Sequence, residues 1–170
     1  GLLKSSIRDN NPVVFIEHKM LYNTKGPIPE EEYTLPIGVA DVKKEGKDVT
    51  LITYSRMTLF CQEAVKVLEN EGISVELVDL RTLLPMDIET VIDSVKKTNR
   101  VLIVEEDCKT GGTGAEISAQ IMENAFDYLD APVVRLAGAD VPMPKSPVLE
   151  KLAIPDTDRI CKAVRDLVRV

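Results

Sequence analysis

The residues best suited to chemistry lie together near the middle of the chain. The acidic run 105–107, Glu-Glu-Asp, follows a short apolar run, and Cys108 comes next. A glycine-rich turn, Gly111 to Gly114, then leads into apolar residues at helical spacing. Acids can hold a hard cation, a cysteine near a helix amino terminus can react as a thiolate, and glycines before a helix can cradle a phosphate. Metal binding, thiol chemistry and phosphate binding are therefore the functions to weigh.

The glycine turn departs from the known phosphate loops. A Walker loop needs a lysine and a serine or threonine directly after its last glycine, whereas Ala115 and Glu116 follow Gly114. The dinucleotide fingerprint needs glycine or alanine at the position of Ile117. We therefore favour glycines that allow a tight turn and close packing of helix on strand, with a phosphate cradle as the alternative.

The acidic run and Cys108 lack the neighbours that their chemistry needs. Three consecutive side chains point in different directions and no second ligand group is near in sequence, so we expect a solvated strand end. Cys108 has no base nearby, because His18 is the one histidine of the chain, and we expect a turn or buried cysteine. His18 itself is expected to be a polar strand-end residue. The sequence thus predicts no catalytic residue, no cofactor ligand and no metal ligand in this chain.

Composition narrows the class of protein further. The chain has 170 residues, 44% of them apolar, which suits one domain or one domain plus a fragment. A net charge of −7 argues against nucleic acid or an anionic membrane as partner and favours a basic protein surface. Three scattered cysteines without a CxxC pair indicate a reducing compartment. The chain starts at Gly1 without an initiator methionine, which suggests a piece of a longer polypeptide.

Strand and helix patterns alternate regularly after residue 37. Apolar runs predict strands at 38–43, 49–54, 74–78, 101–104 and 133–136. Helical spacing predicts one helix from Met57 to near Gly72, one capped by Asp87, one from Gly114 to Asp130 and one opened by Pro155. The proline-rich passage 141–147 is interpreted as an extended crossover rather than a polyproline ligand. These units predict an α/β fold with three αβα layers and a five-stranded, mostly parallel sheet with one antiparallel edge strand near residue 39.

The first part of the chain has a different character. Leu2, Leu3 and Ile7 have helical spacing, and residues 13–16 are typical of a strand. A polar stretch rich in proline and glutamate follows. We therefore predict that residues 1–24 are the tail of a preceding domain, that 25–37 are a linker, and that 38–170 form the main domain.

Several motifs occur in the same order in one known family. They are FIEHK at 15–19 with LY at 21–22, GKDVT at 46–50, VDLRT at 78–82 with LPMD at 84–87, GTGAE at 112–116, DAP at 130–132 and GADVPMP at 138–144. Over essentially its full length the chain resembles the C-terminal part of the E1 β subunits of the 2-oxoacid dehydrogenases, which are thiamine-diphosphate enzymes. The proline motif and the glycine turn favour the pyruvate branch over the branched-chain oxoacid and acetoin branches. One departure is Lys145-Ser146-Pro147, where the family has a tyrosine after the second proline.

The resemblance implies a transketolase-type C-terminal domain from Gly38 onward, preceded by the last helix and strand of a pyrimidine-binding domain. The family's catalytic glutamate and histidine lie earlier than Gly1, and its diphosphate motif belongs to the α subunit. Thiamine diphosphate and Mg²⁺ would therefore be bound by the full α2β2 enzyme, which decarboxylates pyruvate and transfers the acetyl group to the lipoyl E2 enzyme in the step after glycolysis. The fragment alone is expected to be inactive and to bind no cofactor, and His18 does not take the catalytic role.

The resemblance also implies partners and a docking site. The partners are the E1 α subunit, a second β subunit and the peripheral subunit-binding domain of E2, with no nucleic acid and no membrane. In the family an acid matching Asp130 and the terminal carboxylate, here Val170, grip E2. The compartments implied are the mitochondrial matrix, the plastid or the bacterial cytoplasm. Two alternatives are an autonomous small-ligand or nucleotide-binding domain using the glycine turn, and a transketolase-like domain acting on sugars or deoxyxylulose phosphate. The sequence upstream of Gly1 would separate the autonomous domain from the E1 interpretation.

Overall fold

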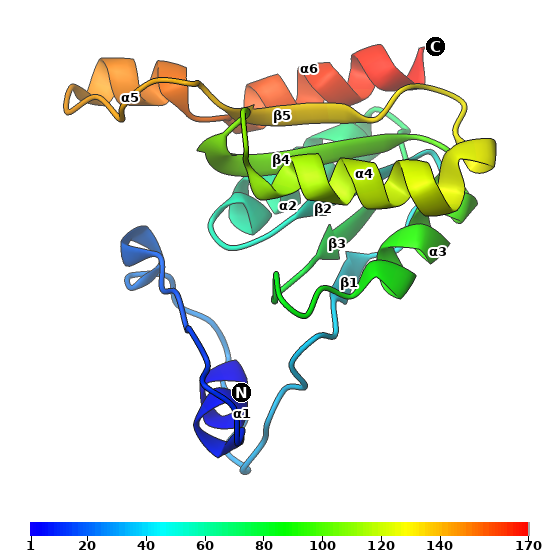
Figure 1. Cartoon of the computed structure of the whole chain (residues 1–170). Coiled ribbons are helices and arrows are strands. Elements are labelled where there is room, and N and C mark those ends of the chain that lie inside the picture. The colour runs from blue at the N-terminus through cyan, green and yellow to red at the C-terminus, as the bar shows by residue number, and fades with distance from the viewer. Residues whose placement is uncertain (170) are drawn as a thin grey trace.

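The computed structural model of the chain describes residues 1–169 and contains the predicted sheet (Figure 1). The five strands are ordered β1-β3-β2-β4-β5, with β1 antiparallel to β3 and the other pairs parallel. This confirms the predicted fold class, including the antiparallel edge. The elements are α1 (Leu2–Arg8), η1 (Lys19–Leu21), β1 (Asp41–Lys44), β2 (Val49–Thr53), α2 (Met57–Asn70), β3 (Val75–Asp79), α3 (Ile88–Thr98), β4 (Val101–Cys108), α4 (Thr113–Ala125), η2 (Phe126–Tyr128), β5 (Val134–Gly138), α5 (Pro147–Ala153) and α6 (Thr157–Val168).

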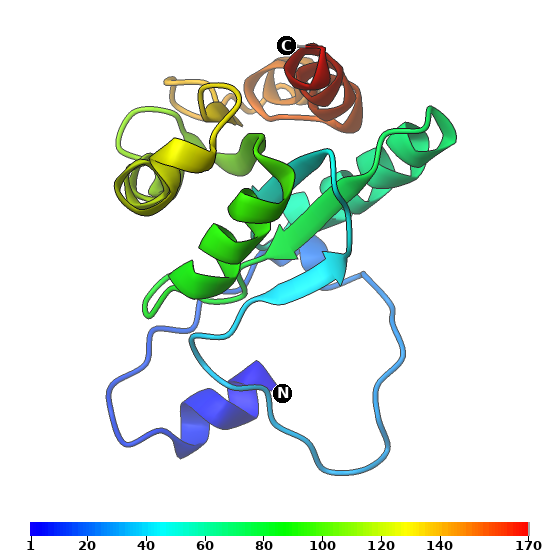
Figure 2. The ribbon, with the colours of Figure 1, turned by 90° about the vertical axis from the view of Figure 1, so that its right-hand side faces the viewer.

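Helices cover both faces of the sheet, so successive strand residues enter different cores. Leu51 and Leu102 pack with α2 and α6, whereas Ile52 and Ile103 pack with α3 and α4. All five residues of β2 are buried, as a central strand requires. Viewed along the sheet, α2 and α6 lie on one side and α3 and α4 on the other (Figure 2). This is the three-layer αβα arrangement expected from the sequence.

The predicted cap at Asp87 is confirmed, and the helix predicted to open at Pro155 has its own cap at the next residue. Asp87 caps α3 by accepting a hydrogen bond from Thr90 N, and Asp156 caps α6 by accepting one from Arg159 N. Gly72 follows α2 with φ +82°, a conformation in which a Cβ would be strained. Local sequence therefore determines where these helices begin and end.

Two segments differ from the prediction. The helix expected to reach Asp130 ends at Ala125, and the 3₁₀ turn η2 follows. Residues 141–146 contain no helix or strand, as an extended crossover requires, but Pro147 then opens the short helix α5, which was not predicted and which projects from the body (Figure 1). Proline at the first turn of a helix costs no hydrogen bond, so a proline-rich stretch can lead into a helix.

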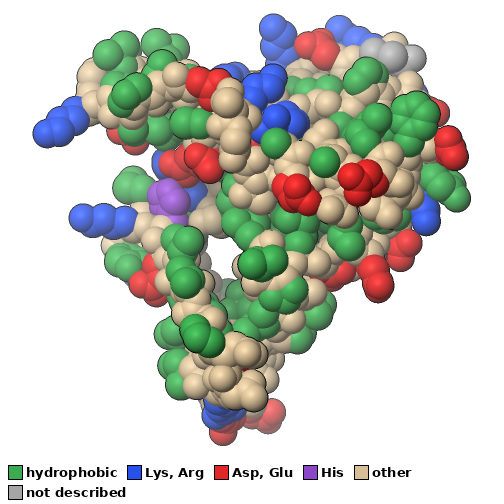
Figure 3. Space-filling view, in the orientation of Figure 1, with side chains coloured by type: hydrophobic (Ala, Val, Ile, Leu, Met, Phe, Trp, Pro, Cys, Tyr) green, Lys and Arg blue, Asp and Glu red, His purple; other side chains and the backbone are tan. Residues whose placement is uncertain are grey.

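Residues 1–37, here called the N-terminal arm, lie apart from the sheet. The helix α1 is confirmed, but no residue of the arm is buried. The strand predicted at 13–16 was wrong within this chain, because the segment has no neighbouring strand to pair with. The arm folds back on itself through Ser5 with Leu35 and Arg8 with Glu32. In the space-filling view an opening separates the arm from the body (Figure 3).

Candidate functional site

A cluster of charged and hydroxyl side chains lies at the carboxyl edge of the sheet, where β2 and β4 end. From β2 the chain crosses to β3 on one side and then returns to β4 on the other, so these two strands flank the point where the winding reverses. Open α/β sheets tend to bind ligands at such a switch point. The carboxyl edge is therefore the first candidate site in the described part of the chain.

Glu105 lies at the centre of this cluster and is fully buried. The expectation that it is solvated was wrong, because β4 continues beyond Val104 and Glu105 follows Ile103 onto the face covered by α4. Its Oε2 accepts a hydrogen bond of 2.7 Å from Gly114 N, at the start of α4. Tyr54 Oη donates to the same oxygen at 3.3 Å, and Arg135 Nη2 lies 3.2 Å from Oε1.

The glycine turn is shaped around this carboxylate. A Cβ on Gly114 would lie 2.3 Å from Glu105 Oε1, and one on Gly112 would lie 2.4 Å from the Cys108 carbonyl oxygen. The preference for close packing over a phosphate cradle therefore agrees with the geometry, since the space at the helix terminus holds a side chain of the protein. Cys108 is exposed at the strand end. Within residues 1–169 no group of three or more histidine, cysteine or acidic side chains has an arrangement that could hold a metal ion.

Glu106, on the other face of β4, joins the N-terminal arm to α2. Its Oε2 lies 3.1 Å from His18 Nε2, and its Oε1 lies 3.1 Å from Arg56 Nη1. His18 Nδ1 accepts a hydrogen bond from Met20 N, so in the neutral ring Nε2 carries the proton and donates it to Glu106. His18 is thus the cap of η1 and not the predicted strand end. Figure 3 shows the histidine between the arm and the body.

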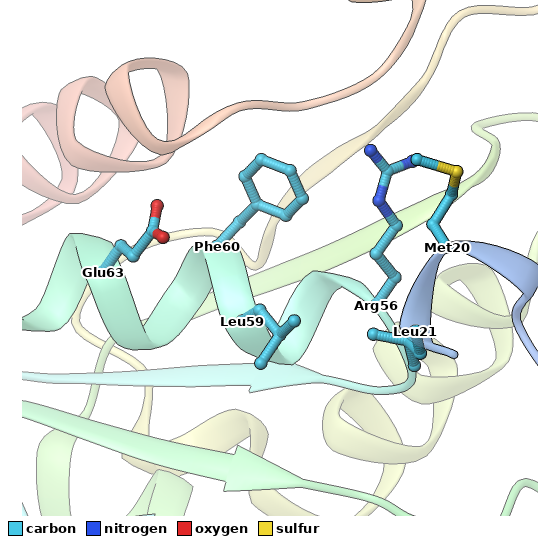
Figure 4. A pocket seen from close by; sticks show the side chains of 6 residues that line it. All are labelled: Met20, Leu21, Arg56, Leu59, Phe60 and Glu63. Atoms are coloured by element: carbon cyan, nitrogen blue, oxygen red, sulfur yellow. The ribbon is translucent and has the colours of Figure 1, made fainter. Parts of the chain in front are cut away.

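Beside this contact, η1 of the arm faces the first turns of α2 across a small hollow (Figure 4). Met20 points toward Arg56, whose guanidinium also stacks 5.3 Å from the centroid of the Phe60 ring. The hollow is lined by Met20, Leu21, Arg56, Leu59, Phe60 and Glu63. The sequence analysis did not single out Tyr54, Arg56 or Arg135. The one feature that could have pointed to Tyr54 and Arg56 is their position directly after a predicted central strand.

The predicted docking residue Asp130 lies at the opposite edge of the sheet. Its carboxylate pairs with Arg100 Nη1 at 3.2 Å while its side chain stays 55% exposed, and its backbone N donates to the Asn99 carbonyl. A groove beside it is lined by Ser118, Met122, Phe126, Leu129, Asp130, Ala131, Pro132 and Val133. Helix α6 ends at the same side of the molecule (Figures 1 and 2). The second predicted docking residue, Val170, lies outside the described residues.

Comparison with known proteins identifies the family of this chain. The transketolase C-terminal domain model matches residues 38–160. The chain belongs to the transketolase C-terminal domain family. Among solved structures, this transketolase-type chain is 31% identical to a split gene transketolase described as an inactive beta4 tetramer, with a TM-score of 0.71 over 81% of this chain and 44% of that one. A 2-oxoglutarate:ferredoxin oxidoreductase from Magnetococcus marinus, 16% identical with a TM-score of 0.52 over 76% of this chain and 19% of that one, shares the fold.

Curated relatives of this transketolase-type domain are β subunits of pyruvate dehydrogenase E1. The mitochondrial subunit of Dictyostelium discoideum is 52% identical over 169 residues, which cover 97% of this chain and 48% of that protein. The subunit of Porphyra purpurea is 53% identical over 168 residues, covering 99% and 51%, and that of Rhizobium meliloti is 47% identical over 166 residues, covering 97% and 36%. The resemblance inferred from the motifs is thereby confirmed. The chain spans about half the length, or less, of these relatives.

Proposed function

We propose that this chain is the C-terminal assembly and E2-docking part of the β subunit of a thiamine-diphosphate-dependent pyruvate dehydrogenase E1. The proposal rests on one observation: the sequence is 52% and 53% identical to two E1 β subunits over 97% and 99% of the chain. The whole enzyme would decarboxylate pyruvate and pass the acetyl group to the lipoyl group of E2. This chain would contribute packing within an α2β2 assembly and a docking surface, and alone it would be inactive.

The same proposal divides the chain into a tail of the pyrimidine-binding domain at 1–24, a linker at 25–37 and the transketolase-type domain at 38–170. The N-terminal arm supports this division because it buries none of its own residues. Val14 and Ile16 are 87% and 85% exposed in an extended segment without a strand partner. Apolar side chains and unpaired backbone groups in this arrangement suit a strand that completes another sheet.

The cofactor would be bound elsewhere in the assembly. Thiamine diphosphate needs donors for its diphosphate and oxygen ligands for Mg²⁺. The glycine-rich turn at the amino terminus of α4 is filled by the Glu105 carboxylate, which would repel a diphosphate. This turn therefore does not fit the diphosphate of the cofactor, and no step of the reaction is assigned to the residues of this chain.

Docking to E2 is proposed at Asp130 and the terminal carboxylate of Val170. Asp130 is exposed, but its carboxylate pairs with Arg100 and its backbone N donates to the Asn99 carbonyl. Pairing with a basic partner would therefore cost little side-chain entropy at Asp130. The apolar groove beside Asp130 supplies contact area next to the charge. A chain with a net charge of −7 also attracts a basic subunit-binding domain at long range.

Reconstitution with an α subunit tests the proposal. The chain is joined to the amino-terminal half of the Dictyostelium β subunit and produced with that organism's E1 α subunit. We expect an α2β2 particle by light scattering, pyruvate-dependent reduction of an artificial electron acceptor, and capture of the E2 subunit-binding domain. A chimaera that folds but neither assembles with the α subunit nor captures E2 would refute the proposal.

A matched pair of variants tests the domain division in the same chimaera. Ile16→Asp places a charge where a strand of the preceding domain would be buried, and we expect it to prevent assembly. Ile28→Asp makes the same change in the proposed linker, where Ile28 is 77% exposed, and should leave assembly intact. Equal behaviour of the two variants would contradict the assignment of the arm.

A further inference from the structure

Glu105 occupies the position that an anionic ligand takes in many open α/β sheets. Helix α4 runs for 13 residues from Thr113, and its amino terminus follows a glycine-rich turn at the switch point of the sheet. The free backbone N–H groups and the dipole of such a terminus favour an anion. Here the anion is supplied by the chain itself, since Gly114 N donates to Glu105 Oε2 at 2.7 Å.

The surroundings of this carboxylate have the character of a binding site for a small oxyanion. Donors converge on it from three directions: α4 through Gly114 N, the end of β2 through Tyr54 Oη, and β5 through Arg135. Arg135 is itself held by a hydrogen bond to the Lys109 carbonyl. Each of these groups donates a hydrogen bond, which matches the acceptor-only character of an ionised carboxylate.

The glycines create the space that the carboxylate fills. A Cβ on Gly114 would lie 2.3 Å from Glu105 Oε1, and one on Gly112 would lie 3.0 Å from Oε2. The side chain has no exposed surface, so no anion from solvent shares the site. Truncating Glu105 would leave the donors and the glycines in place around a vacant volume about the size of a carboxylate group.

We propose that the Glu105 carboxylate takes the place of a bound anion at this corner of the fold, the turn from β4 into α4 at residues 105–114. The carboxylate closes the switch point to oxyanions and phosphorylated ligands, and removing it turns the corner into a binding site for a small oxyanion. This explains why a turn that follows a strand and opens a helix lacks the residues of a phosphate loop. It is independent of E2 docking, which is proposed at the opposite edge of the sheet.

Chemical rescue tests this proposal in the full chain. Glu105→Ala removes the carboxylate, and Glu105→Gln keeps the volume without the charge. Glu106→Ala is the control, because this adjacent acid pairs with His18 and Arg56 instead. Melting temperatures are measured against formate, acetate and phosphate at constant ionic strength balanced with chloride. Phosphate separates a site that admits phosphorylated ligands from one that accepts only a carboxylate.

We expect Glu105→Ala to melt about 5 to 10 °C below the native chain and to recover at least about 3 °C in a saturable manner with formate or acetate. The native chain, Glu105→Gln and Glu106→Ala should show no saturable shift. If Glu105→Ala does not fold in chloride, refolding in formate takes the place of melting. Absence of any oxyanion-specific recovery, or binding of phosphate or nucleotide at this corner by the native chain, would overturn the proposal.

Discussion

Single residues at the carboxyl edge show how one buried charge organises its neighbours. Glu105 is held by a backbone amide, a phenol and a guanidinium, and two glycines leave room for it. A buried carboxylate is stable only when such donors compensate its lost hydration. The consequences can be tested at the glycines and at the phenol separately.

Gly112→Ala should destabilise the fold by about 2 to 4 kcal/mol, because its Cβ would lie 2.4 Å from the Cys108 carbonyl oxygen and the backbone would have to move. Gly26→Ala is the control, since nothing lies within 4 Å of a Cβ there. Urea unfolding monitored by circular dichroism measures both. Equal free energies of unfolding for Gly112→Ala and the native chain would refute the close-packing explanation of the turn.

Tyr54 should make the stability of the chain depend on pH in the alkaline range. Burial first, and then the nearby charges of Glu105 and Asp107, raise the pKa of Tyr54 to about 12. The folded chain therefore binds this proton more tightly than the unfolded chain, and the contribution is fully present below about pH 10 and lost as the pH rises toward about 12. Tyr54→Phe should show a smaller fall in urea midpoint across that interval. Parallel pH profiles for the two proteins would contradict this assignment.

At the scale of elements, Asp87 connects the antiparallel edge strand to α3, the helix of the second parallel crossover. Its Oδ2 accepts a hydrogen bond of 2.8 Å from Ala40 N, just before β1, and its Oδ1 accepts one of 3.1 Å from Thr90 N in α3. One carboxylate thus caps a helix and positions the chain entering an edge strand. Local capping signals predicted the first role, and only the folded chain reveals the second.

Asp87→Ala should cost about 1 to 2 kcal/mol of unfolding free energy, with Asp93→Ala on the exposed side of the same helix as control. Burial alone would raise the pKa of Asp87, but the hydrogen bonds from Ala40 and Thr90 outweigh it and lower the pKa. The stabilisation is therefore present above the unfolded pKa of about 4 and lost as the pH falls below it. Urea titrations near neutral pH and in acid measure this, and a difference between native and Asp87→Ala chains that persists undiminished in strong acid would contradict it.

At the scale of the whole molecule, the two ends of the parallel strands have different surroundings. The carboxyl edge carries the N-terminal arm and the closed Glu105 corner, whereas the opposite edge presents Asp130, the apolar groove and the end of α6. Under the proposed function, the assembled enzyme would join its preceding domain at one edge and leave the other edge free for a partner. Docking at this edge would depend on the charge and the exposure of Asp130 together.

Asp130→Ala, and separately a two-residue extension of the chain after Val170, should each weaken binding of an E2 subunit-binding domain by about 2 to 5 kcal/mol if the charge pairs are buried in the complex. Asp127→Ala removes an exposed acid of the same neighbourhood that does not line the groove and should have little effect. Surface plasmon resonance on the reconstituted E1 at two salt concentrations measures this. Unchanged affinity for both Asp130→Ala and the extended chain would remove this surface from the docking site.

The sequence by itself determined the alternation of strands and helices, the antiparallel edge and the cap at Asp87, because periodicity and capping report burial and backbone geometry within a few residues. The family followed from motifs that the chain shares, in the same order, with known E1 β subunits. Only the tertiary structure decided that Glu105 is buried beside Arg135, that His18 meets Glu106, and that the segment at 13–16 has no strand partner in this chain. Glu105 and Arg135 are 30 residues apart in the sequence, and His18 and Glu106 are 88 residues apart. A carboxylate at the end of a strand has the same local sequence whether water or a guanidinium compensates its charge, and only the packing of distant elements decides which one does.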